Sequence, residues 1–350
     1  MVAAQTMVSI IIPMRNEEKY IGKCLESILA NSYPSEQYEI LIADGESTDS
    51  SRQIVSEISC RHANIRVLSN AAKIVPTGLN QAIRQANGKY ILRMDAHTDY
   101  PPDYIQNCIA ELDRTGAANV GGRCITLPGA ETLTGKSIAL LTQTRAGVGN
   151  AAYRLGLGDV YVDTVPFGAF RREILAEVGL YQEDLARNQD YELNARIRSH
   201  GYKIFLSSKI CSFYHNVPTF AAFMRQAYLN GSWSARCWRR YPVSFCWRHA
   251  APLLFVGALT GTFVLGLVLR PALWLVVLGL LLYILMALTA SVKIARQGEW
   301  KCAVLAPVLM FPYHFVYGLA TFVGLVHPFK SRSTSFHNLQ NKGPALTQDA

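Results

Sequence analysis

The chain has 350 residues, of which 50% are hydrophobic, and its formal net charge at pH 7 is +9. This length is enough for one large domain or two ordinary ones. The basic balance fits an anionic membrane surface or a phosphorylated substrate. The chain contains no nucleic-acid-binding motif, so we expect no nucleic-acid partner.

Strand and helix patterns alternate through the first hundred residues. Residues 8–13, 38–43 and 90–94 are short apolar runs typical of strands that are buried on both faces, and 65–68 is a weaker run of the same kind. Helical spacing fills the intervals between them, at residues 17–30, 48–60 and 77–86. This alternation predicts an α/β fold with a mostly parallel, doubly wound sheet.

The pattern loosens in the middle of the chain. Residues 132–158 are rich in Gly, Thr and Ala, which predicts either a mobile loop over the site or an irregular connection. Residues 160–170 return to strand character, 187–200 predict a polar amphipathic helix, and 203–206 predict a short strand.

The last third of the chain is strongly apolar. Residues 219–240 alternate aromatic and basic side chains at helical spacing, which predicts a helix on a membrane surface. Residues 250–269 and 272–292 are each long and apolar enough to span a bilayer. A third apolar stretch, 302–326, contains two prolines. If this third stretch spans the membrane, the basic tail lies on the outer side, against the tendency of basic residues to stay in the cytosol. If it is instead re-entrant or interfacial, the tail stays on the cytosolic side, and both arrangements remain open.

These observations predict four regions. They are a catalytic domain at 1–218, an amphipathic interfacial segment at 219–249, a membrane region of two to three spans at 250–326, and a polar tail at 327–350 that carries Lys330, Arg332 and Lys342. The eight cysteines show neither a C-x-x-C pair nor a zinc spacing, which favours a reducing compartment. Met1–Thr6 is too short and polar for a signal peptide. We therefore expect a multi-pass protein of the cytoplasmic (inner) membrane with a cytosolic catalytic domain.

Polar clusters follow three of the predicted strands. They are Pro-Met-Arg-Asn-Glu at 13–17, Asp-Gly-Glu-Ser-Thr-Asp at 44–49, and Asp-Ala-His at 95–97. Ligands of such sheets bind beyond the carboxyl ends of the strands, so we expect a nucleotide here. Backbone N–H groups at a helix start suit a phosphate, and an Asp such as Asp44 can accept the imide N–H of uracil. The same residues also fit ordinary helix starts, with Asn16 and Ser47 or Thr48 as caps.

Two further features indicate catalysis. Asp95 and His97 lie two residues apart after a strand, so both can reach one divalent cation, which would neutralise a diphosphate leaving group. Asp190 lies at a predicted helix start and suits a general base for an acceptor hydroxyl, although Asp is also a common helix cap. Near Gln226, aromatic side chains fit either sugar stacking or anchoring at the membrane surface.

In this order and spacing, the motifs resemble the inverting family 2 glycosyltransferases of the GT-A fold, over residues 8–240. The variant Arg-Met-Asp-Ala-His-Thr at 93–98, followed by Tyr100-Pro101, is similar to bacterial exopolysaccharide glucosyltransferases of the succinoglycan type. The resemblance implies a UDP-sugar as donor, which in that subgroup is UDP-glucose. It also implies a polyprenyl-diphosphate-linked saccharide as acceptor, and Mn²⁺ or Mg²⁺ as cofactor.

The resemblance also implies roles for individual residues. Pro13, Arg15 and Glu17 would line the nucleoside pocket, and Asp44 would read the base. Asp95 would contact ribose and phosphate, and His97 would hold the metal in place of a second Asp. Asp190 would be the catalytic base, and the acceptor and diphosphate side would be shaped by Glu192 and Gln226.

The sequence departs from the family pattern at two places. The family usually has Asp at the position of His97, and imidazole favours manganese over magnesium more than a carboxylate does. Gln226 is followed by Ala-Tyr-Leu-Asn in place of the x-x-Arg-Trp of processive members, which argues against processive synthesis.

Three alternatives remain open at this point. The sugar acceptor could be polyprenyl phosphate itself. A sugar-nucleotide pyrophosphorylase shares the nucleotide-binding logic, but residues 13–17 lack the Gly-rich loop of that class. A catalytically silent membrane scaffold would fit the replacement of the family's usual Asp by His97. The presence of Asp44, Asp95 and Asp190 argues against it.

Overall fold

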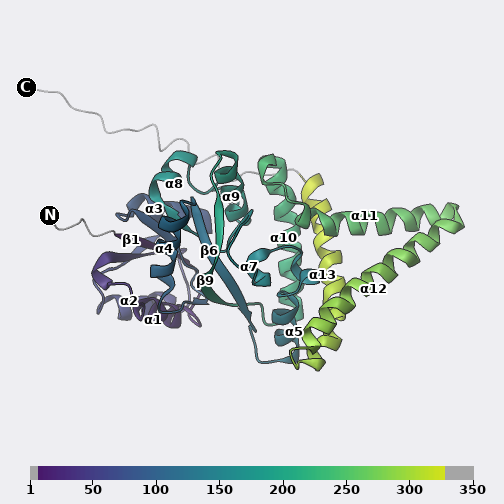
Figure 1. Ribbon diagram of the computed structural model, residues 1–350, viewed down its shortest axis with the longest axis horizontal. Coiled ribbons are helices and arrows are strands. Elements are labelled where there is room, and N and C mark those ends of the chain that lie inside the picture. Colours follow the sequence, from purple (N-terminus) through teal and green to yellow (C-terminus); the bar gives the residue numbers. More distant parts are fainter. Residues whose placement is uncertain (1–6, 328–350) are drawn as a thin grey trace, which may run out of the picture.

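The computed structural model describes residues 7–327, which form an α/β domain followed by a set of long apolar helices (Figure 1). The sheet has the strand order β3-β2-β1-β4-β8-β6-β9-β5, and β7 pairs with β9. Its first half is parallel and consists of β1 (Val8–Met14), β2 (Tyr38–Asp44), β3 (Ile65–Ser69) and β4 (Tyr90–Arg93). The prediction of an α/β fold with a mostly parallel sheet is confirmed.

Helices cover both faces of this sheet. One face is packed by α1 (Ile21–Leu29), α2 (Ser51–Ser59) and α4 (Tyr104–Thr115), and the other by α3 (Val75–Gln85), α8 (Arg172–Val178) and α9 (Gln189–Ser199). The central strand β1 shows why, because Ile10 and Ile12 belong to one core and Ile11 to the other. Such a strand is apolar without alternation, as the sequence pattern indicated.

The second half of the sheet is mixed. β6 (Asn119–Leu127) runs parallel to β9 (Ile204–His215), while β8 (Ala169–Arg171) is antiparallel to both β4 and β6. Short strands β5 (Thr98–Asp99) and β7 (Val160–Tyr161) pair with β9. The strand expected at 160–170 is thus two short strands, since the chain turns at Phe167 and Gly168, whose φ angles are 59° and 101°.

The segment expected to be a loop or an irregular connection contains three helices. They are α5 (Leu133–Leu141), α6 (Arg145–Val148) and α7 (Ala152–Leu155). Threonine caps begin two of them, because Thr132 Oγ1 accepts the Gly135 N–H and Thr144 Oγ1 accepts the Gly147 N–H, each at 3.1 Å. The threonines that made the sequence look irregular are therefore helix-start signals.

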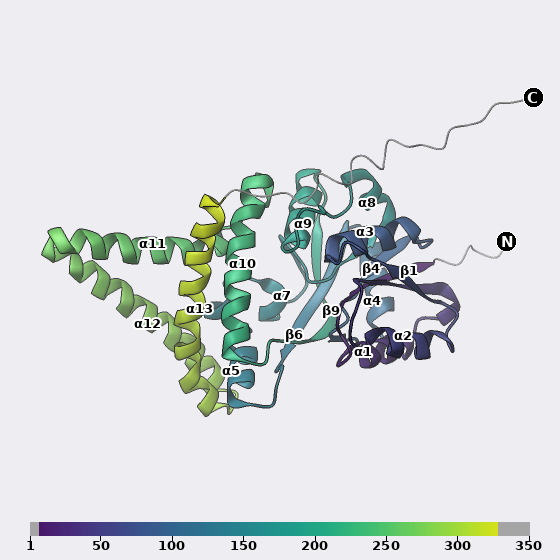
Figure 2. The ribbon, with the colours of Figure 1, turned by 180° about the vertical axis from the view of Figure 1, so that it is seen from behind.

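Four long helices follow, namely α10 (Phe220–Arg240), α11 (Trp247–Val268), α12 (Leu273–Ala295) and α13 (Trp300–Val326). In both views α11 and α12 project from the body as a hairpin, whereas α13 runs alongside α10 (Figures 1 and 2). Three helical stretches are long and apolar enough to cross a membrane: Trp247–Val268, Arg270–Ala295 and Trp300–Val326. Apart from His327, the predicted polar tail lies outside the described residues.

The helix expected on the membrane surface, α10, packs along α13. In the apolar 18-residue stretch of α13, 39% is buried, because α10 and α5 cover it. The corresponding share is 11% for Trp247–Val268 and 17% for Arg270–Ala295. Two glycines allow the close approach. A Cβ on Gly231 of α10 would lie 2.3 Å from the Tyr317 carbonyl oxygen, and one on Gly324 of α13 would lie 2.4 Å from that of Ser232.

This packing predicts opposite effects of the same substitution at two helical glycines. Gly→Ala in a helix interior is favourable by about 0.5–1 kcal/mol on propensity alone. At Gly231 the added methyl meets backbone, and such overpacking typically costs about 1–3 kcal/mol. We expect Gly231→Ala to lower the Tm of the detergent-solubilised protein. The control Gly279→Ala, where nothing lies within 4 Å of the added Cβ, should leave the Tm unchanged or raise it. Equal Tm values for both variants would contradict the close contact.

Candidate active site

The loops after β1 and β2 are joined by hydrogen bonds. The Asn16 N–H donates to Ser47 Oγ at 3.0 Å, the Thr48 N–H donates to Asn16 Oδ1 at 2.8 Å, and the Glu17 N–H donates to Ser51 Oγ at 2.7 Å. Asn16 adopts a φ of 56°, a left-handed conformation that Asn tolerates better than most residues. The first two predicted motifs therefore form one polar rim at the carboxyl edge of the sheet.

Asp44 lies at the base of this rim and is fully buried. Its Oδ1 accepts bonds from the Ser47 N–H and hydroxyl at 3.1 and 2.6 Å, and its Oδ2 pairs with Arg52 Nε at 2.6 Å. Because an ionised carboxylate has about four acceptor positions, Oδ2 keeps one for a base. Arg15 is exposed and lies against Gly45, where an added Cβ would be 3.2 Å from the Arg15 Cδ.

Asp95 and His97 follow β4, the neighbour of β1. Arg93 holds both oxygens of Asp95, with Nε–Oδ1 at 2.9 Å and Nη2–Oδ2 at 3.2 Å. His97 Nδ1 lies 3.1 Å from Glu17 Oε1. Burial alone lowers the pKa of the His97 imidazole, but the bond to Glu17 and the charge of Asp95 outweigh it, so this pKa is raised above its usual value.

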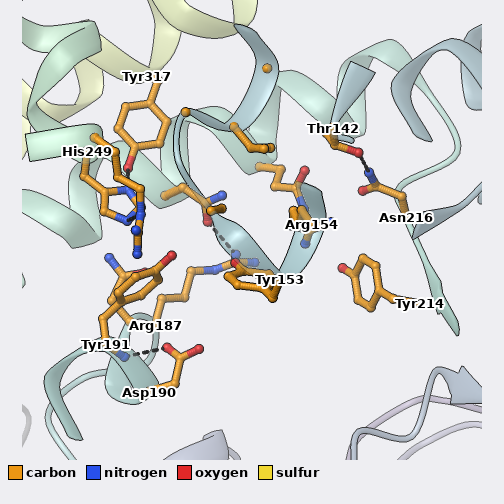
Figure 3. A pocket seen from close by; sticks show the side chains of 18 of the residues that line it. Thr142, Tyr153, Arg154, Arg187, Asp190, Tyr191, Tyr214, Asn216, His249 and Tyr317 are labelled. Carbon is orange, nitrogen blue, oxygen red and sulfur yellow. Dashed lines mark hydrogen bonds between the residues drawn. The ribbon is translucent and has the colours of Figure 1, made fainter. Parts of the chain in front are cut away.

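A cavity of about 460 Å³ opens between the α/β domain and the apolar helices (Figure 3). Asp95, His97, Asp190 and Gln226, all expected site residues, line it. Asp190 stands in the first turn of α9, where its Oδ1 accepts its neighbour's N–H, that of Tyr191, at 3.0 Å. Of the other expected site residues, the lining does not include Pro13, Arg15, Glu17, Asp44 and Glu192.

The donor set at Asp95 and His97 fits a metal ion only in part. Among residues 7–327, no group of three or more His, Cys, Asp and Glu side chains is placed to hold an ion alone. Magnesium in phosphate-transferring sites is typically held by one or two carboxylates together with substrate phosphates. One carboxylate and one imidazole on the cavity wall fit an ion that is shared with a diphosphate.

Sequence reasoning missed a second set of cavity residues. Three arginines line the wall, Arg154 from α7, Arg187 from the turn before α9, and Arg248 from the start of α11. Tyr153 and Tyr317 lie beside them (Figure 3). Arg187 is only three residues before Asp190, a proximity that could have suggested it. Nothing in the sequence shows that Arg248 turns toward the catalytic domain.

Glu192 lies outside the cavity, and its partners explain why. Its carboxylate is 1% exposed and pairs with Arg196, with Oε2–Nη2 at 2.8 Å. The Arg196 guanidinium also donates to the carbonyl oxygens of Val178, Gly179 and Leu180. The pair thus fastens α9 to the chain that follows α8, and a contact of Glu192 with the acceptor or the diphosphate stays a prediction.

The comparisons identify a glycosyltransferase, and its fold is of the GT-A type. Residues 9–179 match the family model described as Glycosyl transferase family 2, and the chain carries a domain of this family. A mannosyltransferase structure from Pyrobaculum calidifontis, PcManGT in complex with GDP-Man and Mn²⁺, superposes with a TM-score of 0.57 at 18% identity, covering 92% of this chain and 88% of the other. At that identity the likeness shows the fold.

Two curated relatives are similar in sequence. The dolichyl N-acetyl-alpha-D-glucosaminyl phosphate 3-beta-D-2,3-diacetamido-2,3-dideoxy-beta-D-glucuronosyltransferase of Methanococcus voltae is 27% identical over 91% of this chain and 97% of its own length. The succinoglycan biosynthesis protein ExoA of Rhizobium meliloti is 29% identical over 59% of this chain and 62% of its own length. The first similarity therefore includes the apolar helices as well as the α/β domain.

The Glu192–Arg196 pair yields a prediction that separates structure from substrate binding. Glu192→Gln leaves a largely buried guanidinium without its carboxylate, and breaking such a pair costs about 3 kcal/mol or more. In a protein of this size we expect the Tm to fall by roughly 5–10 °C, while the Kd for UDP of the folded protein stays within about twofold of the original. The matched control is Glu57→Gln on the exposed face of α2, which should leave both values unchanged. An unchanged Tm with weakened UDP binding would instead place Glu192 in the ligand site.

Proposed function

We propose that this protein transfers a hexose from a nucleotide sugar, in the first instance glucose from UDP-glucose, to a lipid-linked saccharide at the cytosolic face of a membrane, with inversion at the anomeric carbon. One observation carries the proposal. A single cavity is lined by Asp95 and His97 from the sheet edge, by Asp190, and by residues of α11 and α13, two of the candidate membrane helices. Donor chemistry and a membrane-borne acceptor can therefore meet in one space.

The comparisons support the choice of acceptor. The Methanococcus relative is named for a dolichyl-phosphate-linked sugar, and the Rhizobium relative for succinoglycan biosynthesis. UDP-glucose as the donor rests on the resemblance to succinoglycan-type glucosyltransferases. All eight cysteines are free, which supports a catalytic domain in the reducing cytosol.

In the proposed reaction the acceptor hydroxyl oxygen attacks the anomeric carbon while the bond from that carbon to the diphosphate oxygen breaks. Asp190 takes the hydroxyl proton, and the nucleoside diphosphate leaves with the bonding electrons. Asp190 suits this role because it faces the cavity and its Oδ2 has no hydrogen bond among the described residues. Arg93 fixes the orientation of Asp95 toward the donor side.

Asp95 and His97 would hold a divalent cation, Mn²⁺ or Mg²⁺, which would supply positive charge for the diphosphate. Glu17 fixes the His97 ring by its bond to Nδ1, so that the other ring nitrogen is the one left for a ligand. The remaining expected residues, Pro13, Arg15 and Asp44, would shape the nucleoside side, and Gln226 the acceptor side.

The proposal is tested with detergent-purified full-length protein, Mn²⁺, a panel of UDP-, GDP- and dTDP-sugars, and membrane lipid extract. We expect nucleoside diphosphate release that requires one donor, the lipid and the metal, and that is abolished by EDTA. If no donor is consumed and none binds by calorimetry, the protein is a silent scaffold and the proposal fails. Transfer to sugar-free polyprenyl phosphate would replace the acceptor in the proposal.

The base assignment makes a separate prediction. Asp190→Asn should lower kcat by about a hundred- to ten-thousandfold, the range that a positioned base contributes, with the Kd for the donor nearly unchanged. The control Asp103→Asn alters an exposed carboxylate at the start of α4 and should keep full activity. Near-normal turnover of Asp190→Asn would remove Asp190 from the mechanism.

A further inference from the structure

The cavity holds more positive charge than its own carboxylates balance. Neither Arg154 nor Arg187 takes part in any ion pair of residues 7–327. Each donates to a neutral oxygen, Arg154 Nη1 to Thr126 Oγ1 at 2.8 Å and Arg187 Nη1 to Asn230 Oδ1 at 3.1 Å. Burial lowers the pKa of the Arg187 guanidinium below its usual value, as expected for a cation that lacks a counter-charge.

Arg248 adds a donor that has no partner. Its side chain is 5% exposed, and its Nη1 pairs with Asp163 Oδ2 at 2.7 Å. Its Nη2 is buried and makes no hydrogen bond within the described chain. An unmade bond at a buried charged group is costly, by about 1–3 kcal/mol or more, so this atom calls for an acceptor from outside the protein.

The two carboxylates on the cavity wall do not cancel this charge. Asp95 is already paired with Arg93. Among the described lining residues, Asp190 is then the one carboxylate left to balance the charges of Arg154 and Arg187. The Nη2 of Arg248 also lacks a partner among them. Buried cations are stable in proteins when an anion pairs with them, so the wall is built for an anionic ligand.

The position of Arg248 indicates which ligand. It is the second residue of α11, at the beginning of the first candidate span, and the same wall includes Pro252 and Tyr317 from the apolar helices. Figure 3 shows Asp190 on one side of the cavity and His249 and Tyr317 on the other, with Tyr153 and Arg187 between them. An anion at Arg248 therefore lies where the cavity meets the apolar helices, beside Tyr191, the residue next to Asp190.

We propose that Arg248, with Arg154 and Arg187, binds the phosphate or diphosphate group of the lipid-linked acceptor. This inference rests on the proposed function, which it deepens by assigning the acceptor's anionic group to residues separate from the donor's diphosphate site at Asp95 and His97. Planar guanidinium groups with several donors suit phosphate oxygens, which they bind bidentately.

The test compares two diphosphates on full-length protein in detergent. Farnesyl diphosphate serves as the lipid probe, farnesol as its uncharged counterpart, and UDP as the donor probe. We expect the original protein to bind farnesyl diphosphate at least tenfold more tightly than farnesol. Arg248→Gln should weaken farnesyl diphosphate binding by about tenfold, the equivalent of one lost charge-assisted bond, and leave the Kd for UDP within about twofold. Arg66→Gln, a change of an exposed arginine on β3, is the matched control and should alter neither.

Two results would overturn the inference. Unchanged farnesyl diphosphate binding in Arg248→Gln removes the site, and a larger loss for UDP than for farnesyl diphosphate assigns these arginines to the donor. If Arg248→Gln does not fold because Asp163 loses its partner, Arg154→Gln is measured in the same way with the same two outcomes. Failure of the proposed function looks different, since it appears as absent sugar transfer by the original protein whatever these binding constants are.

Discussion

The position of β1 between β2 and β4 is the constraint on which the rest of the structure depends. Nearly all of its side chains are buried, and they divide between the cores on the two sides of the sheet. Because β1, β2 and β4 run parallel, their carboxyl ends meet at one edge, which brings the loop of Glu17 against those of Ser51 and His97. A change in this strand order would separate the polar clusters and leave no shared rim for a nucleotide.

Much of this arrangement could be predicted from the sequence, because it depends on local patterns. The runs at 8–13 and 38–43 are strands buried on both faces, and they match β1 and β2 to within one residue. The meeting of Asp95, His97 and Asp190 on one cavity wall could be expected once the order of motifs was recognised. These features follow from periodicity and from the geometry of parallel sheets.

Features set by distant partners could not be predicted in this way. The region of α5 looked irregular because its capping threonines and glycines are also loop residues. The bonds of Arg196, the i,i+4 partner of Glu192 in α9, to the carbonyl oxygens of three residues after or at the end of α8 have no sequence signal, so the part that this pair plays in fastening α9 could not be predicted. Asp44 and Asp95 each pair with an arginine, whereas Asp190 forms no ion pair within residues 7–327. Only the folded structure shows which of these carboxylates is paired with a cation.

The contact of α5 and α10 with α12 and α13 has a consequence for how the chain is organised. One hydrophobic cluster contains Ile138 of α5, Phe223 of α10, Ala287 of α12 and Met310 of α13, so the core continues across the boundary at 218/219. The Lys293 ammonium at the end of α12 also donates to the Gln143 carbonyl oxygen at 2.7 Å. The apolar helices are thus an integral wall of the enzyme and not a detachable anchor. During biosynthesis, the walls of the cavity are complete only after α13, which contributes Tyr313 and Tyr317, has been made.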